Sequence, residues 1–252
     1  MALKIGVQLQ PQATTTDALR AAWRTADAAG ADSIWVWDHF YPLHGDPDAA
    51  HFEGYSLLAA MAVETSHAAV GAMVTCNSYR NPELLADMAR TIDHLSGGRF
   101  ILGIGSGWFE RDYTEYGYEF GTGPSRLRDL AAALPRIQAR LAKLNPPPVQ
   151  QPLPLLIGGS GEKVTLRLVA EHASLWNAFG DPAEFQRKSR ILDDWCAKVG
   201  RDPAAIERTV LVQPADIGLL PGYEAVGVQH VILSLEHPFD LAPLLQAQAQ
   251  RG

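Results

Sequence analysis

The sequence is poor in cysteine, in net positive charge and in long apolar runs. Two cysteines, Cys76 and Cys196, are too few for a disulfide framework or a four-thiolate metal site. The formal net charge of −7 argues against a nucleic-acid-binding protein, which normally presents a basic face. No apolar run reaches membrane-spanning length, and residues 2–9 are too short and too interrupted for a signal peptide. We therefore expect a soluble, cytoplasmic protein.

What the chain does contain is a regular alternation of short apolar runs with helical patterns. The apolar runs predict strands at residues 3–9, 33–37, 69–75, 100–104, 154–157, 174–177, 209–212 and 230–234. Over 252 residues this alternation is typical of an α/β protein, a (β/α)8 TIM barrel, with a single domain spanning residues 1–252. The seventh βα unit is shortened, because only a few residues around 222–225 remain for its helix.

Two further segments carry specific expectations. Residues 105–123 are predicted to be a long loop, and its aromatic residues favour a functional role. Ser125 is predicted to cap the helix that follows, and Pro135 is expected to kink or break that helix.

Residues 95–108 contain the most informative stretch, in which paired glycines end a helix and a buried strand leads into Gly105-Ser106-Gly107. Glycines at a strand end allow a flat ligand to lie against bare backbone. A dinucleotide fingerprint is excluded because its third glycine position holds Trp108. A serine nucleophile elbow is excluded because Ile104 and Trp108 flank Ser106 where glycines are required. A glycine-rich strand end without a ligand stays as the alternative.

In parallel barrels the active site lies at the carboxyl ends of the strands. This rule gathers the following polar and glycine residues around one mouth: Gln8, Asp38, His39, Thr75, Cys76, Asn77, Ser106, Gly107, Trp108, Gly158, Gly159, Ser160, Gly161 and Asn177. Within this set, residues 158–161 precede a helix predicted from about Lys163 and form a candidate anion site, although a plain turn with a serine cap is the alternative. Asp38 and His39 are a candidate proton-transfer pair, with a histidine bonded only to backbone as the alternative.

The loop after the second strand also raises the question of a metal. His39, His44, His51, Asp46 and Asp48 lie close in sequence, but their spacing matches no common ligand motif, and we expect no metal site. Among the tryptophans, Trp35 and Trp37 share one strand face and are best explained by packing, whereas Trp108 is placed to cover a flat ring.

Five segments resemble the luciferase-like monooxygenase superfamily, in particular its coenzyme F-420-dependent oxidoreductases. They are residues 32–40 (DSIWVWDHF), 52–60 (FEGYSLLAA), 74–82 (VTCNSYRNP), 95–108 (LSGGRFILGIGSGW) and 157–161 (IGGSG). The resemblance covers about residues 3–200 and implies a (β/α)8 barrel that is usually dimeric.

The resemblance also implies roles for individual residues. Asp38 and His39 would face the redox-active ring, and Thr75-Cys76 would fall at a bulge with a non-prolyl cis peptide that supports the deazaflavin. Asn77, Ser106, Gly107 and Trp108 would contact the cofactor, with Gly158 and Asn177 beside them, and Gly159-Ser160-Gly161 would bind its phosphate. Trp108 stands where some members have a catalytic glutamate, and the usual insertion before the last strand is nearly absent.

We therefore expect an oxidoreductase that transfers a hydride between coenzyme F-420 and a small organic substrate, with His39 and Asp38 in the proton chemistry. One alternative is a monooxygenase using flavin mononucleotide (FMN) reduced by a partner reductase. Others are a metal-dependent hydrolase and a cofactor-binding protein without turnover. The expected partners are a small-molecule substrate and a second copy of the chain, with no nucleic acid and no membrane.

Overall fold

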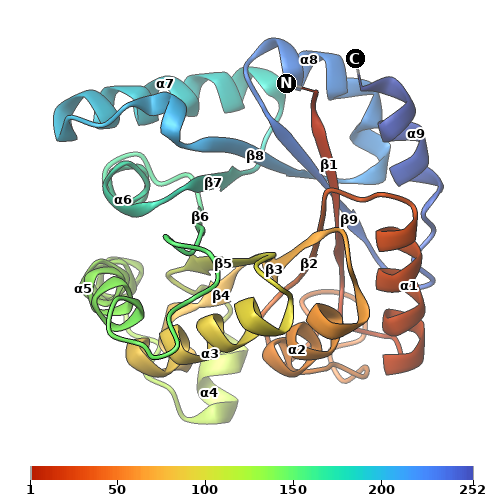
Figure 1. The fold of residues 1–252 in the computed structure, drawn as a ribbon, viewed down its shortest axis with the longest axis horizontal. Coiled ribbons are helices and arrows are strands. Elements are labelled where there is room, and N and C mark those ends of the chain that lie inside the picture. Colours follow the sequence, from red (N-terminus) through yellow and green to blue (C-terminus); the bar gives the residue numbers. More distant parts are fainter. Residues whose placement is uncertain (1, 252) are drawn as a thin grey trace.

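The computed structural model describes residues 2–251 and places parallel strands in a closed ring surrounded by helices (Figure 1). The strands are β1 (Lys4–Leu9), β2 (Ser33–Val36), β3 (Ala69–Ala72), β4 (Thr75–Cys76), β5 (Phe100–Gly105), β6 (Leu155–Gly158), β7 (Leu175–Ala178), β8 (Glu207–Val212) and β9 (His230–Leu235). Neighbours pair in the order β3-β2-β1-β9-β8-β7-β6-β5, and β3 pairs with β5 to close the ring. Because β4 continues β3 and also pairs with β5, the segments fill eight barrel positions, and the predicted (β/α)8 barrel is confirmed.

Helices cover the strands, and several of them begin at a residue whose side chain caps the first turn. The helices are α1 (Thr16–Ala28), α2 (Gly54–Glu64), α3 (Pro82–Leu95), α4 (Glu110–Tyr116), α5 (Gly123–Leu141), α6 (Thr165–His172), α7 (Pro182–Val199), α8 (Leu220–Ala225) and α9 (Ala242–Gln250), with short 3-10 helices η1 (Asn77–Tyr79), η2 (Pro203–Ala205) and η3 (Pro214–Leu219). Asn81 and Asp181 accept hydrogen bonds from the first turns of α3 and α7, each followed by a proline at the first helical position. Within residues 2–251, no helix is long and apolar enough to cross a membrane.

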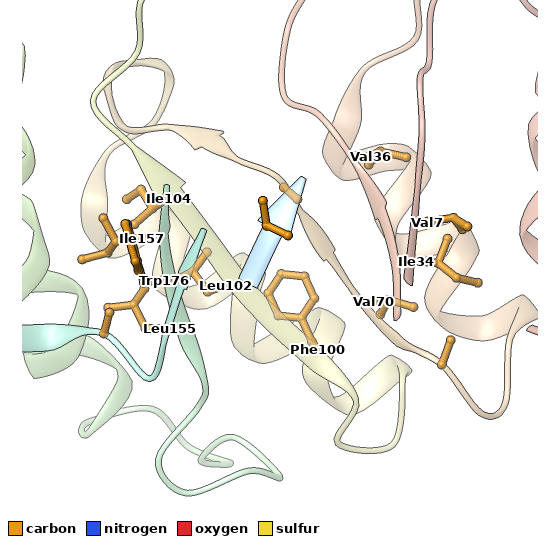
Figure 2. Close-up of a cluster of buried hydrophobic side chains, with 14 of the residues drawn as sticks. Val7, Ile34, Val36, Val70, Phe100, Leu102, Ile104, Leu155, Ile157 and Trp176 are labelled. Carbon is orange, nitrogen blue, oxygen red and sulfur yellow. The ribbon is translucent and has the colours of Figure 1, made fainter. Parts of the chain in front are cut away.

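Alternation along the strands divides the core into an outer and an inner cluster. The outward-facing side chains pack under the helices, and Figure 2 shows Val7, Ile34, Val70, Leu102, Ile157 and Trp176 among them. The inward-facing side chains fill the barrel itself: Trp35, Met73, Ile101, Leu156, Leu175 and Ile232. Trp35 is therefore a core residue, as its pattern predicted. Because the interior is filled, a ligand has to bind above it, at the mouth.

Several glycines around the mouth are required by packing. Val74 is half-buried and follows β3, and the Met73–Val74 peptide bond is cis, just before the Thr75-Cys76 segment where the resemblance placed such a bond. A Cβ added to Gly105 would lie 2.8 Å from a Val74 methyl carbon, and one added to Gly158 would lie 2.9 Å from the other. The bare backbone at Gly105 therefore makes room for Val74, which is a different reason from the ligand contact that the sequence suggested.

The predicted loop over residues 105–123 is partly wrong, because it contains the helix α4. Glu110 and Asp112 in its first turn favour the positive end of the helix dipole. Gly117, at φ +71°, ends the helix in the left-handed conformation, with its N–H bonded to the Tyr113 carbonyl. The density of aromatic residues hid these local helix signals.

Two expectations about α5, a break at Pro135 and a cap at Ser125, are also wrong. The helix runs unbroken through Pro135, which lies on the exposed face while Leu134 and Ile137 beside it are buried, so packing maintains the helix despite the missing N–H. The N-cap is Thr122, and Ser125 instead completes a capping box by bonding back to Thr122.

The seventh unit is short but contains more helix than the sequence suggested. η3 continues directly into α8, and together they connect β8 to β9, which pair in parallel. Ile217 and Tyr223 are buried, and the Tyr223 hydroxyl donates a 2.9 Å hydrogen bond to the Gly180 carbonyl. This short crossover is enough to close the barrel.

Candidate functional site

Strand register brings the predicted residues to one level at the carboxyl end of the barrel. Gln8 pairs with Ser234, Cys76 with Gly105, and Gly158 with Asn177. Asn177 is buried, and its side-chain oxygen accepts a 2.8 Å hydrogen bond from the hydroxyl of Thr209, one strand along. Residues that are up to 226 positions apart in the chain therefore share one rim.

His39 lies at this rim with its ring fixed on one side. It is only 8% exposed, and its Nδ1 lies 2.7 Å from Oδ2 of Asp112. Asp38, which the sequence suggested as the proton-transfer partner of His39, does not orient its ring, because the carboxylate bonded to Nδ1 comes from α4. The rings of Trp108 and Phe109 approach the imidazole edge-on, at centroid distances of 5.8 and 5.6 Å. Within residues 2–251, Nε2 of His39 has no hydrogen-bond partner.

Asp112 is a residue of this site that the sequence reasoning missed. It is fully buried, and its Oδ1 accepts hydrogen bonds from the backbone N–H groups of Phe40 and Tyr41, at 3.1 and 3.2 Å. Its Oδ2 accepts one from the Tyr79 hydroxyl at 2.8 Å and faces His39. The only local signal was an acidic residue in the first turn of a helix after Trp108, and that helix was read as a loop.

Asp38 is engaged by a different partner. Arg80 donates two hydrogen bonds to its carboxylate, at 2.6 and 2.9 Å, and the Cys76 N–H donates a third at 3.1 Å. Burial raises the pKa of the Asp38 carboxyl, while Arg80 and the Cys76 N–H oppose the rise. Burial also opposes the charge on Arg80, but the attraction of Asp38 outweighs it and raises the Arg80 pKa. This geometry makes Asp38 an anchor for β4.

Three predicted residues of the β4 region are largely held by packing. Thr75 is fully buried, with its hydroxyl 2.9 Å from that of Tyr55, and Asn77 is buried in η1. The Cys76 sulfur lies 3.2 Å from the Tyr113 hydroxyl, and burial raises the pKa of this thiol.

Gly107 fits closely over this region. It has φ +81°, and a Cβ there would lie 2.6 Å from the Cys76 sulfur and would overlap the Tyr113 hydroxyl. Glycine is thus needed at this position for conformation and for space, with or without a ligand.

Two large apolar side chains are exposed at the rim. Trp108, after β5, is 61% exposed, and Phe179, after β7, is 58% exposed. Ser106 is half-buried between β5 and Trp108. Exposed aromatic rings are available for stacking against a flat ligand. Phe179 was not singled out from the sequence, because a lone phenylalanine after a strand carries no local signal.

The segment Gly158–Gly161 forms a backbone turn before α6. Gly159 has φ +121°, its N–H donates to the Asn177 carbonyl at 3.1 Å, and its own carbonyl accepts from the Trp176 indole at 2.8 Å. In the described part of the chain, the N–H groups of Ser160 and Gly161 have no protein acceptor. α6 begins at Thr165, slightly later than predicted, and no side chain caps it, so the serine-cap alternative is not what the structure shows. Free N–H groups beside a helix start favour an anion.

The remaining histidines of the rim pair with neutral partners. The Trp37 indole donates a 2.9 Å hydrogen bond to Nε2 of His51, whose pKa is lowered to about 4, chiefly by burial and also by His39. Gln12 contacts His44 through its side-chain amide. Over residues 2–251, no group of three histidine, cysteine, aspartate or glutamate side chains is placed to hold a metal ion.

One family model matches most of the chain, and known relatives can be aligned with it. The family model described as luciferase-like monooxygenase matches residues 2–215. The chain is 27% identical over 223 residues to 5,10-methylenetetrahydromethanopterin reductase from Archaeoglobus fulgidus, covering 81% of this chain and 62% of that protein.

Two solved structures show the same fold over almost the whole chain. An F-420-dependent secondary alcohol dehydrogenase in complex with an F-420–acetone adduct superposes with a TM-score of 0.84 at 16% identity, covering 98% of both chains. The oxygenating constituent of 3,6-diketocamphane monooxygenase from Pseudomonas putida, in complex with FMN, superposes with a TM-score of 0.75 at 13% identity, covering 98% of this chain and 96% of that one.

Proposed function

The chain belongs to the luciferase-like monooxygenase family and is an oxidoreductase, and we propose that it transfers a hydride between coenzyme F-420 and a small organic substrate. The observation that carries this proposal is His39, which is fixed through Nδ1 and has its Nε2 unpaired at the rim beside Trp108. A neutral imidazole in this position can accept or return a proton while a hydride moves at a neighbouring carbon.

The residues of the rim fit a cofactor with a flat ring and a phosphate. The backbone turn at Gly159, Ser160 and Gly161 lies near the start of α6. The unpaired N–H groups of Ser160 and Gly161 can donate hydrogen bonds to a phosphate there. We assign the ring to the region of Trp108, Ser106 and Gly107, with the backbone of Thr75, Cys76 and Asn77 and with Gly158 and Asn177 at the adjacent strand ends. A deazaflavin held there would supply a carbon that accepts or donates a hydride.

The protein's own contribution is orientation, exclusion of water and proton transfer. When an alcohol gives up a hydride to such a cofactor, Nε2 of His39 would take the hydroxyl proton. The reverse reaction returns the same proton from the imidazolium to the oxygen of the carbonyl. Asp38, expected from the sequence to share this chemistry, supports it indirectly by holding the Cys76 backbone through its N–H.

Cofactor identity is tested by titrating the purified protein with coenzyme F-420 and with FMN, following cofactor fluorescence. We expect tighter binding of F-420, followed by turnover in a screen of alcohols and ketones. Tighter binding of FMN would favour the monooxygenase alternative, in which a separate reductase supplies reduced flavin. Tight F-420 binding without any turnover would favour a cofactor-binding protein.

We also propose that the protein is a cytoplasmic homodimer that contacts its partner through the groove between α2 and α3. This groove is lined by Leu84, Met88 and Leu95, of which Leu84 is 54% exposed and Leu95 45% exposed. Light scattering should report a dimer, and the double substitution Leu84→Glu and Leu95→Glu should convert it to a monomer. Leu245→Glu on α9, where Leu245 is equally exposed at 54%, is the control that leaves the dimer intact.

A further inference from the structure

We propose that Asp112 is a positioning residue that holds neutral His39 with its proton on Nδ1, so that the lone pair of Nε2 is directed to the rim as a proton acceptor. The inference deepens the proposed function and relies on it for the role of His39 in turnover. The tautomer itself is a property of this chain and can be measured without substrate.

The two carboxylate oxygens of Asp112 have separate sets of donors. Oδ1 receives the backbone N–H groups of Phe40 and Tyr41, whereas Oδ2 receives the Tyr79 hydroxyl and faces Nδ1 of His39 at 2.7 Å. An ionised carboxylate has no hydrogen to donate, so the 2.7 Å contact requires the hydrogen to be on Nδ1. The other ring nitrogen of the neutral imidazole then carries the lone pair.

Few other charged or titratable groups face this pair. Asp112 approaches His39 from α4, and Tyr79 reaches Asp112 from η1. His51 approaches from the loop before α2, and because its pKa is lowered to about 4 it is neutral near pH 7. Trp37, Trp108 and Phe109 complete the surroundings with aromatic edges. The charged neighbour in direct contact with the imidazole is therefore Asp112.

Asp112 is also hydrogen-bonded to the backbone that follows His39. The N–H groups of Phe40 and Tyr41 belong to the two residues that follow His39, so Asp112 is bound to the same short segment whose imidazole it orients. The buried carboxylate thus fixes both the backbone after β2 and the ring. When Nε2 takes a proton, the resulting imidazolium already lies beside a carboxylate, and no side chain has to move.

The test is the nearly isosteric substitution Asp112→Asn. The asparagine oxygen is expected to keep the two backbone donors at the Oδ1 position, which places its NH2 group toward His39. An NH2 group donates, so Nδ1 must become the acceptor and the proton must move to Nε2. Nitrogen-15 NMR of the imidazole, with His39 assigned from the spectrum of His39→Gln, should show protonated Nδ1 in the wild type and protonated Nε2 in the variant.

Activity provides the second measurement. We expect Asp112→Asn to lower kcat by about 10²–10⁴-fold and to leave the Kd for F-420 within a few-fold. Tyr79→Phe is the matched control, because it removes the other donor to Oδ2 and leaves the carboxylate facing His39. It should keep the wild-type tautomer and a kcat within a few-fold.

The outcomes separate this inference from the proposed function. A wild-type His39 with its proton on Nε2, or an unchanged tautomer in Asp112→Asn, overturns the role of Asp112. The wild-type spectrum alone decides this point even when the variant does not fold. A wild-type protein that neither binds F-420 nor turns over with it overturns the proposed function. The NMR measurement still decides the tautomer of His39, because it needs neither cofactor nor substrate.

Discussion

Replacing Arg80 by methionine should destabilise the protein far more than replacing an arginine of similar geometry at the surface. Asp38 is fully buried, and Arg80 supplies two of its three hydrogen bonds. Without the guanidinium, the carboxylate keeps only the Cys76 N–H in an environment that excludes water. Removing one partner of a buried ion pair typically costs about 3–5 kcal/mol, and we expect Arg80→Met to lose that amount of unfolding free energy.

The matched control is Arg136→Met. Arg136 also donates two hydrogen bonds to a carboxylate, that of Glu83, at 2.8 and 2.6 Å, but both side chains are well exposed. Water replaces the lost partner there, so the unfolding midpoint should hardly change. Urea unfolding of both variants, followed by tryptophan fluorescence, measures the difference.

A second substitution and a change of pH identify the buried charge as the cause. Asn at position 38 carries no charge, so Arg80→Met with Asp38→Asn should be more stable than Arg80→Met alone. Burial unopposed by Arg80 raises the folded-state pKa of Asp38 further, and a raised carboxyl pKa means that protonation favours the folded state. The loss should therefore shrink as the pH falls from 7.5 toward 5. Equal losses for Arg80→Met and Arg136→Met would refute this reasoning.

Three further predictions concern other parts of the molecule. His39→Ala should lower turnover by about 10²–10⁴-fold while F-420 affinity stays within a few-fold, and a parallel loss of affinity in the same titration would make His39 chiefly a cofactor contact. Gly159→Val should weaken F-420 binding by about 1–3 kcal/mol, because hydrogen bonds to the phosphate are lost. Circular dichroism checks the fold, and Gly123→Val, at a glycine with open space around it, is the control. Unchanged affinity would mean that the phosphate binds elsewhere. Burial raises the pKa of Glu207, but His230 and Lys4 outweigh burial and lower the pKa from 4.5 to about 2. The ionised Glu207 therefore stabilises the fold above pH 4.5, and this stabilisation is lost as the pH falls toward 2. Between pH 6 and 3.5 the stability advantage of the wild type over Glu207→Gln should fall by about 1.4 kcal/mol, and a constant advantage in urea unfolding would contradict the assignment.

The barrel could be predicted because its signals are local. Apolar strand runs, the Asn81-Pro82 and Asp181-Pro182 helix starts and the Gly200 helix stop each lie within a few residues of the element they define. The placement of the predicted site residues on one rim followed from the same alternation. α4 was missed because its helix signals lie among aromatic residues, and Pro135 was misjudged because packing outweighed a local rule.

The pairing within the site could not be predicted in the same way. His39 and Asp112 are 73 residues apart, and Asp38 and Arg80 are 42 apart, so neither pair has a sequence pattern. Sequence proximity suggested the wrong partner, because Asp38 and His39 are adjacent in the chain but bond to different groups. Only the packing of α4 and η1 against the end of β2 decides which carboxylate meets which cation or imidazole.

The contact of Val74 with Gly105 and Gly158 has a consequence for anyone who wishes to reshape the enzyme. Gly105 and Gly158 lie on different strands and Val74 lies between β3 and β4, but the three share one small volume. We therefore expect an alanine at either glycine to be tolerated only when Val74 is shortened at the same time. Saturation libraries that vary one of these positions alone would return mostly damaged proteins. Libraries that vary all three together would explore new shapes for the floor of the rim, and homologues should exchange these residues in concert.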